Sequence, residues 1–272
     1  MNATHTQPAF NDFAALFAEH GGTDFDYLRV HYARYLGTRA RLLARWSPGD
    51  GKRILDVGAH WLHQSLLYAI EGFDVTAFDV PATLDRPEVQ ALARAHGIRI
   101  LQNPDLEYPN ALGSVANDSF DLILFTEIIE HLAFNPVAMW REIYRVTRPG
   151  ARIVLTTPNY YGLRRLLRAA ARFLHGDGGG VPVDNLLGQP DFAHHWKEYS
   201  TRELGCYFHT LSPDFTTNHF AYVGKHEAGA LHPLIDTMLR SVERLLPSMR
   251  PNLYAEVTLV RKDKGIAVEP HW

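Results

Sequence analysis

Two aspartates in the first half of the chain stand at the ends of short apolar runs, with a spacing that suits a ligand with two polar ends. Asp56 lies inside "RILDVG" (53–58), and Asp79 lies near the end of "DVTAFDV" (74–80). A carboxylate after the second run can accept a hydrogen bond from each of two ribose hydroxyls. A carboxylate within the first run can hold a cationic amino group, directly or through water. A ligand with an amino-acid end and a nucleoside end would fit both.

The loop between these runs, "GAHWLH" (58–63), is poor in glycine. A dinucleotide-binding loop requires Gly-x-Gly-x-x-Gly, because the pyrophosphate approaches the backbone closely and rests on a helix N-terminus. Only Gly58 is present, and Asp56 lies within the strand. A nicotinamide-dependent oxidoreductase is therefore disfavoured.

A second group of candidate residues follows a later apolar run. "TEIIEHL" (126–132) contains Glu127, Glu130 and His131, and these three would share one face of a helical turn. Carboxylates and imidazoles can remove a proton or bind a divalent cation. The alternative is structural, with glutamates that cap a helix and a histidine that packs through hydrogen bonds.

The elements that must position these residues are alternating strands and helices. Apolar runs predict strands over 53–58, 74–80, 98–103, 120–127 and 151–159. The intervening helices include one over 86–96 and one with Asn135 as N-cap and Pro136 in its first turn, which Pro149-Gly150 ends. This alternation predicts an α/β fold with a mainly parallel sheet covered by helices on both faces.

The pattern differs on either side of this core. Helical spacing over 10–46, broken at Gly21-Gly22, predicts an N-terminal helical cap over residues 1–50. Residues 51–272 would form the main domain, with a lid insertion at about 160–193. Two late strands, "FTTNHFAYVG" and "LYAEVTLVRKD", flank a helix over 229–246.

The chain resembles the class I S-adenosylmethionine-dependent methyltransferases over residues 50–160 and 194–262. "ILDVGAHW" is similar to the first motif of that superfamily, "FDV" to its second, "SFDLILFTEIIEHL" to its fourth, and "VTRPGARIVLTTPN" to its fifth strand. The resemblance implies a Rossmann-like, seven-stranded sheet with an antiparallel last strand. It also implies S-adenosyl-L-methionine as cofactor and methyltransferase activity.

The resemblance assigns cofactor contacts to Asp56, Gly58 and Asp79. The superfamily has Gly-x-Gly-x-Gly in its first motif, where this chain has Gly58, His60 and Leu62. We expect His60 or His63 to donate a hydrogen bond to the cofactor carboxylate in place of the lost backbone approach. The rival interpretation is a loop closed over an empty cleft in a non-catalytic binding or regulatory protein.

For the adenine, the superfamily uses a residue after the third strand. "QNPDLEY" offers Asp105 as acceptor for the exocyclic amine and Leu106 as an apolar neighbour of the ring. An ordinary solvated turn is an equally good interpretation of these two residues.

The acceptor side is assigned to Glu127, Glu130, His131 and His195. Glu-x-x-Glu-His with a distant histidine four residues before Tyr199 resembles the metal site of small-RNA 2′-O-methyltransferases, and ubiquinone-pathway O-methyltransferases have a similar run. A divalent ion there would bind two hydroxyls of the acceptor and lower the pKa of the attacking one. His131 or His195 as a plain general base is the alternative.

Two further assignments in "HHWKEYSTREL" (194–204) stay open. His194 can replace His195 in either role, and Ser200 can serve simply as the cap of the helix that "TREL" begins.

The acceptor is predicted to be a small molecule, such as a sugar, lipid precursor or specialised metabolite, methylated on oxygen rather than nitrogen. The helix "LRRLLRAAARFL" (163–174) has arginines on one side and leucines on the other. It could contact an anionic membrane, hold a phosphorylated or carboxylated acceptor, or pack its leucines on the core as a solvated lid.

Composition limits the classes of partner and the compartments that fit this chain. A formal net charge of -3 over 272 residues and a pI near 6.6 disfavour nucleic acid as a partner. The single cysteine, Cys206, excludes an internal disulfide and fits a reducing compartment. The first residues do not resemble a secretion signal, and no run approaches 18 apolar residues. We therefore expect a cytoplasmic protein.

Overall fold

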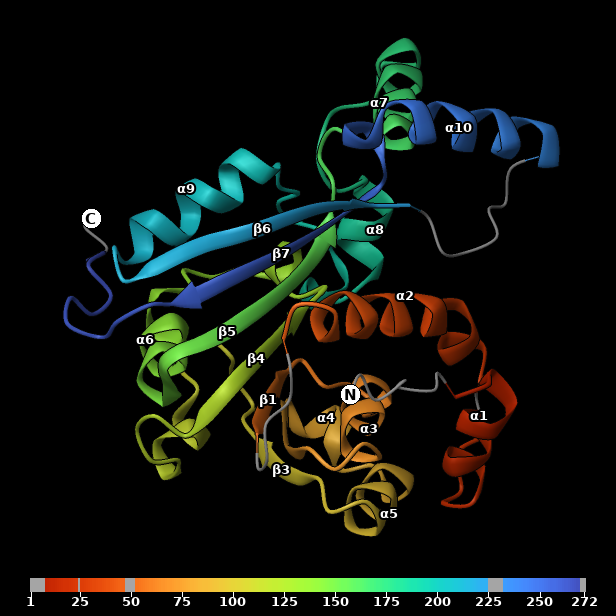
Figure 1. Cartoon of the computed structure of the whole chain (residues 1–272). Helices are drawn as coiled ribbons and strands as arrows, with labels where there is room; N and C mark the ends of the chain where they lie inside the picture. Colours follow the sequence, from red (N-terminus) through yellow and green to blue (C-terminus); the bar gives the residue numbers. More distant parts are fainter. Residues whose placement is uncertain (1–7, 24, 47–51, 225–231, 270–272) are drawn as a thin grey trace. The chain divides into compact units, whose positions relative to one another are not determined.

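The chain consists of two compact units, Met1–Pro104 and Asp105–Trp272. The computed structural model describes residues 8–23, 25–46, 52–224 and 232–269 (Figure 1). The strand order is β3-β2-β1 in the first unit and β4-β5-β7-β6 in the second. The seven strands have the mostly parallel topology that the sequence predicts. The predicted fold class is therefore confirmed. The separation of residues 1–50 from 51–272 stays a prediction.

The first unit contains three parallel strands and the helices that connect them. β1 pairs with β2 and β2 with β3, both in parallel register. The elements in chain order are α1 (Phe10–Ala18), α2 (Asp26–Leu43), β1 (Arg53–Val57), α3 (His63–Ala69), β2 (Asp74–Asp79), α4 (Pro81–Leu84), α5 (Pro87–Ala95) and β3 (Arg99–Gln102).

The N-terminal helices α1 and α2 pack on the start of α3 through aromatic rings. The ring of His63 lies 4.8 Å from that of Phe17 and 6.2 Å from that of Tyr35. His63 is 5% exposed. Burial, and then the nearby His60 and His31, lower the pKa of His63 to about 3. The fold therefore holds this imidazole neutral.

The second unit contains one parallel and two antiparallel strand pairs. β4 pairs with β5 in parallel, while β7 is antiparallel to both β5 and β6. Its strands and α-helices are β4 (Phe120–Thr126), α6 (Val137–Val146), β5 (Thr147–Pro158), α7 (Leu163–His175), α8 (Val183–Gly188), α9 (Thr201–Leu211), β6 (Phe215–Val223), α10 (Pro233–Leu245) and β7 (Asn252–Leu259). Its 3-10 helices are η1 (Asn110–Ser114), η2 (Ile129–His131), η3 (Asp191–Ala193) and η4 (Pro247–Met249).

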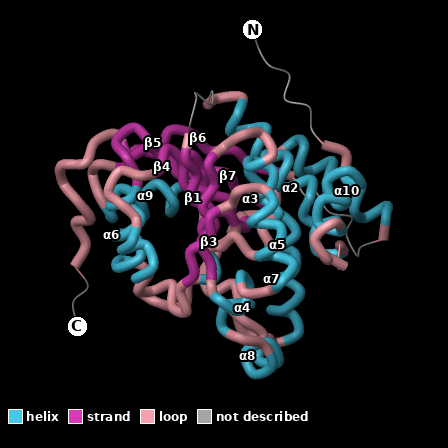
Figure 2. Tube along the Cα trace, turned by 90° about the horizontal axis from the view of Figure 1, so that it is seen from below, coloured by secondary structure: helices cyan, strands magenta, loops and turns pink. Residues whose placement is uncertain are grey.

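Helices α6 and α9 lie side by side in the second unit (Figure 2). Trp140 of α6 is fully buried and packs its ring 5.2 Å from that of Phe208. Its indole Nε1 donates a hydrogen bond to the Tyr207 hydroxyl at 2.7 Å. Because the one polar atom of the indole has a partner, this large aromatic residue can be buried without a polar penalty.

Two details of the predicted elements are wrong. Asn135 is not the N-cap of α6: that position is Pro136, although the Asn135 side chain still accepts a hydrogen bond from the Val137 amide at 3.1 Å. Pro149-Gly150 does not end the helix either, because α6 ends at Val146 and both residues lie within β5. There the register between β4 and β5 shifts, so that the extra residues are accommodated as a bulge.

The cap of α9 is confirmed. Ser200 is the N-cap, its hydroxyl accepts from the Glu203 amide, and the Glu203 carboxylate accepts from the Ser200 amide. This capping box fixes where the segment before α9 ends. No helix among the described residues is long and apolar enough to span a membrane.

Replacing His63 with phenylalanine is predicted to make the stability of the protein less sensitive to acid. The folded pKa of about 3 lies below the unfolded value of 6.5. Unfolding therefore takes up a proton as the pH falls below 6.5, and the wild type loses about 1.4 kcal/mol of unfolding free energy per pH unit from this residue. Urea unfolding between pH 7 and 4 should show a slope shallower by one proton in His63→Phe.

The matched control is His209→Gln, which changes an exposed histidine of α9. An unchanged slope in His63→Phe would contradict the burial of a neutral His63. The slope, and not the absolute stability, is the readout, since the larger ring can also alter packing.

Candidate functional site

The loop after β1 keeps an unusual backbone at all three positions where the superfamily has glycine. Gly58, His60 and Leu62 have φ values of 71°, 49° and 65°. Non-glycine residues seldom adopt this left-handed region, which costs roughly 1–2 kcal/mol per residue. The loop thus retains the conformation of a glycine-rich loop although two of its glycines are absent.

Hydrogen bonds from the end of β2 hold this loop. The Gly58 amide donates to the Phe78 carbonyl at 2.8 Å, and the His60 amide donates to Asp79 Oδ2 at 2.7 Å. The Val80 amide donates to Asp79 Oδ1 at 2.6 Å. Asp79 is 8% exposed, and burial raises its pKa, an effect that these amides oppose. A carboxylate has about four acceptor sites, so Asp79 retains capacity for ribose hydroxyls.

Asp56 is held differently. It is 1% exposed in β1, and the Ser65 hydroxyl of α3 donates to its Oδ2 at 2.6 Å. Burial raises the pKa of Asp56 to about 7, although the hydrogen bond from Ser65 opposes the shift. The carboxyl group therefore changes charge near neutral pH. Sequence reasoning missed Ser65, whose only signal was its place in the first turn of a helix that follows the loop.

The rings of His60 and His63 belong to an aromatic cluster. The His60 ring stacks on Trp61 at 4.3 Å and lies 4.8 Å from Tyr27 of α2. The Arg86 guanidinium lies 4.9 Å over the Trp61 ring. Burial, and then Arg86, lower the pKa of His60 to about 4. The Nδ1 atoms of His60 and His63 are buried and have no hydrogen-bond partner among the described residues.

A pocket opens beside this cluster within the first unit. Its lining includes Trp61, His63 and Arg86, together with apolar residues of α1 and α5. Neither Asp56 nor Asp79 lines it. It is therefore separate from the two carboxylates that the sequence assigns to the cofactor.

Asp105 and Leu106 begin the second unit. Asp105 is exposed, and its Oδ1 accepts a hydrogen bond from the Glu107 amide at 2.8 Å, which closes a short turn. Leu106 is half-buried. Their contact with adenine stays a prediction.

The expectation that Glu127, Glu130 and His131 share one helical face is wrong. Only Ile129–His131 form a helical turn, the 3-10 helix η2, and Glu127 precedes it with φ 55°. The Glu127 amide donates to the Thr156 carbonyl at 2.8 Å, which continues the pairing of β4 with β5. Glu127 is thus still held as part of the strand end.

Glu130 and His131 are fixed by neighbours from two other segments. Glu130 is fully buried, and the Thr157 hydroxyl of β5 donates to its Oε2 at 2.9 Å. The His131 Nδ1 atom lies 3.0 Å from the His194 carbonyl oxygen. A carbonyl only accepts, so we assign the proton to Nδ1 and the lone pair to Nε2. This Nε2 lies 4.0 Å from Glu130 Oε1.

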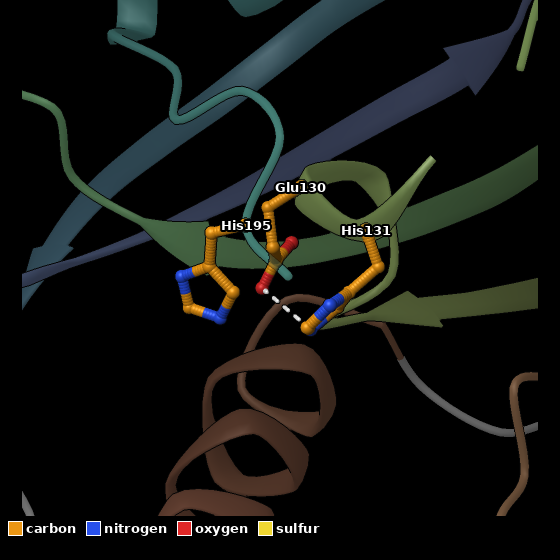
Figure 3. A group of neighbouring side chains, drawn as sticks. All are labelled: Glu130, His131 and His195. Carbon is orange, nitrogen blue, oxygen red and sulfur yellow. Dashed lines mark ion pairs between the residues drawn. The ribbon is translucent and has the colours of Figure 1, made fainter. Parts of the chain in front are cut away.

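The segment before α9 brings a second histidine to the same place. The Trp196 amide donates to the Glu130 carbonyl at 2.7 Å, which ties this segment to η2. The rings of His195 and His131 lie 4.7 Å apart. In Figure 3 the carboxylate of Glu130 lies between the two imidazoles, and one ligand atom from each residue lies within 4.8 Å of the others.

His194 does not join this cluster. Its side chain is 2% exposed and its ring lies 5.3 Å from that of Trp196, while its carbonyl orients His131. Sequence reasoning missed this backbone role, and it missed Thr157. The signal for Thr157 was a polar residue at the end of the fifth predicted strand, "LTTPN".

Both imidazoles of the cluster are shifted towards the neutral form. Burial, and then the charge of His195, lower the pKa of His131, while the His194 carbonyl and Glu127 oppose the shift. Burial also lowers the pKa of His195, which Glu127 opposes and Arg168 reinforces. Two neutral imidazoles beside a buried carboxylate can take up a proton from an acceptor or bind a divalent cation.

Comparison with known proteins assigns the sequence to a family. The profile of a methyltransferase-domain family matches residues 28–210, which is more than half of the chain. No curated protein matches the sequence.

Solved structures share the fold at low sequence identity. The 1,6-didemethyltoxoflavin-N1-methyltransferase of Burkholderia thailandensis, solved with 1,6-didemethyltoxoflavin and S-adenosylhomocysteine, has a TM-score of 0.55 at 16% identity and covers 94% of this chain and 92% of its own. A SAM-dependent methyltransferase from Archaeoglobus fulgidus has a TM-score of 0.51 at 18% identity, covering 86% of this chain and 99% of its own. One from Methanosarcina mazei has a TM-score of 0.51 at 16% identity, covering 78% and 93%.

At these identities the structural neighbours establish the fold, and the matched profile establishes the family. The chain belongs to the methyltransferase-domain family, and its fold is shared with solved S-adenosylmethionine-dependent methyltransferases.

Proposed function

We propose that this methyltransferase acts on a hydroxyl oxygen of a small molecule, such as a sugar, a lipid precursor or a specialised metabolite, with nitrogen as the less favoured acceptor. The observation that carries the proposal is the group formed by Glu130, His131 and His195 at the end of β4. A hydroxyl must lose its proton to become a good nucleophile, and these side chains offer the means to remove it.

The cofactor side of the proposal uses the loop after β1. When bound, S-adenosylmethionine supplies an electrophilic methyl group on a sulfonium. Asp79 would accept from its ribose hydroxyls, because this carboxylate is fixed by two backbone amides and keeps acceptor capacity. Asp56 would hold the amino group, and Gly58 and His60 would face the carboxylate.

The acceptor side uses the orientation of His131. Its Nδ1 proton is engaged by the His194 carbonyl, so Nε2 is the basic atom, next to Glu130. As a general base, Nε2 would take the hydroxyl proton, and the buried Glu130 carboxylate would stabilise the imidazolium that forms. His195, 44% exposed, is the member of the group most accessible to an acceptor.

The same three residues also suit a divalent cation. Two imidazole nitrogens and one carboxylate oxygen are ligands typical of zinc and of other first-row metals. The contacts of Thr157 with Glu130 and of the His194 carbonyl with His131 are of the kind that orient metal ligands. In this role the ion would lower the pKa of the acceptor hydroxyl. Glu127 lies outside the group whose ligand atoms come within 4.8 Å of one another.

Asp79→Ala is predicted to weaken binding of S-adenosylmethionine by about tenfold or more, because it removes charged hydrogen-bond acceptors for the ribose and releases the His60 amide. Calorimetric titration of both proteins measures the effect. Asp74→Ala is the matched control, since Asp74 lies at the exposed start of the same strand. Equal affinities of Asp79→Ala and wild type would contradict the proposed ribose contact.

His131→Ala is predicted to lower kcat by about 100-fold or more, which is the usual contribution of a general base. The assay is transfer of labelled methyl from S-adenosylmethionine to a panel of hydroxylated small molecules. Activity requires a neutral imidazole. The lowered pKa of His131 therefore predicts that wild-type kcat/KM falls in acid with a midpoint below pH 6.5, the ordinary pKa of histidine.

Three further measurements are needed to interpret this assay. His209→Ala, an exposed histidine outside the group, should retain full activity. Chelator treatment separates the two roles: a base works without metal, whereas an ion-dependent site loses activity and regains it with added Mn²⁺ or Zn²⁺. Full activity of both His131→Ala and His195→Ala would contradict the proposal.

A further inference from the structure

Helix α7 has two chemically opposite sides. At 100° per residue, Leu163, Leu166, Leu167, Ala170, Phe173 and Leu174 fall on one side. The other side contains four arginines, Arg164, Arg165, Arg168 and Arg172, and the helix contains no acidic residue. Such a pattern normally means that the apolar side is packed on a protein core.

The structure does not bury this apolar side. No residue of α7 is buried, and the exposure of its large apolar side chains rises along the helix. Leu167 is 50% exposed, Phe173 80% and Leu174 82%. Figure 1 shows α7 rising away from the strands of the second unit. The interpretation of α7 as a lid that packs its leucines on the core is therefore not supported.

Ion pairs hold the first turn of α7 and leave the rest of the basic side open. The Arg164 guanidinium pairs with Asp236 at 2.7 Å and with Glu243 at 2.9 Å, both on α10. Arg165 pairs with Glu198. Among the described residues, no ion pair engages Arg168 or Arg172, and the latter donates to the Gly180 carbonyl at 3.0 Å. The helix is anchored at its start, and its second half presents cations beside exposed apolar side chains.

We propose that the second half of α7 binds the surface of an anionic lipid bilayer. An amphipathic helix with a basic polar side lies in the plane of such an interface, with its apolar side chains among the acyl chains and its cations at the phosphates. Phe173 and Leu174 would insert, and Arg168 and Arg172 would contact anionic headgroups. The positive charge of α7 favours an anionic bilayer as the occupant, because each arginine near an anionic surface contributes about 1 kcal/mol to the binding free energy.

Binding of α7 to a bilayer would not depend on the identity of the methyl acceptor. A helix of 13 residues is too short to cross a bilayer, so the contact is peripheral. The net charge of -3 would repel an anionic surface, so that attraction must come from this local group of arginines.

Sedimentation of the full chain with vesicles tests the proposal. Wild type should bind vesicles of 3:1 phosphatidylcholine and phosphatidylglycerol and should bind pure phosphatidylcholine at least tenfold more weakly. The double variant Phe173→Ser/Leu174→Ser should lose at least tenfold in affinity for the anionic vesicles. Arg168→Gln should lose about fivefold, which corresponds to one cation near the surface. Val260→Ser, which changes an exposed apolar residue directly after β7, is the control and should bind as wild type.

Three results would overturn the proposal. The first is no sedimentation with either vesicle. The second is binding that Phe173→Ser/Leu174→Ser does not weaken. The third is self-association of the wild type that this variant abolishes, without vesicle binding, because the occupant of the apolar side would then be a second copy of the chain. Circular dichroism of each variant establishes that the fold is retained.

Discussion

Buried carboxylates in strands and in the turn after β4 determine much of the local structure of this protein. Asp56, Asp79 and Glu130 are 1%, 8% and 0% exposed. A buried carboxylate without donors is costly, so each must receive hydrogen bonds from the segment that follows or adjoins its strand. Ser65 serves Asp56, the amides after β1 and β2 serve Asp79, and Thr157 serves Glu130. The loops that supply these donors are thereby fixed.

This requirement explains how a loop without its usual glycines keeps their conformation. A left-handed residue costs about 1–2 kcal/mol. For His60, a hydrogen bond from its amide to the Asp79 carboxylate contributes about 1.5–3 kcal/mol, which is enough to offset that cost. For Leu62 the compensation is hydrophobic, because its side chain is fully buried and such burial contributes about 1.5–3 kcal/mol. Two different interactions therefore replace the freedom of glycine.

The sequence was sufficient to predict the strands and the longer helices, since their apolar periodicity is local, but it did not predict the short helices α4 and α8. It failed where boundaries depend on pairing: the strand that includes Pro149-Gly150 is defined by β4, and no local signal outweighs the usual tendency of Pro-Gly to end a helix. The sequence also could not predict that the ring of His195 lies beside that of His131. Successive side chains of an extended segment point to opposite sides, so either His194 or His195 could have faced the cluster. The bond from the Trp196 amide to the Glu130 carbonyl selects His195.

The charge state of the imidazole pair follows from a competition that burial wins. Glu127 favours the protonated form of both His131 and His195, yet burial is the largest influence on each and lowers both pKa values. The Glu127 carboxylate thus does not make either ring cationic at neutral pH. The pair consequently offers lone pairs and not positive charge to whatever approaches from the exposed side of His195. An acceptor with a proton to lose, or a cation, suits this environment better than an anion does. This polarity supports the proposal that the acceptor is a hydroxyl.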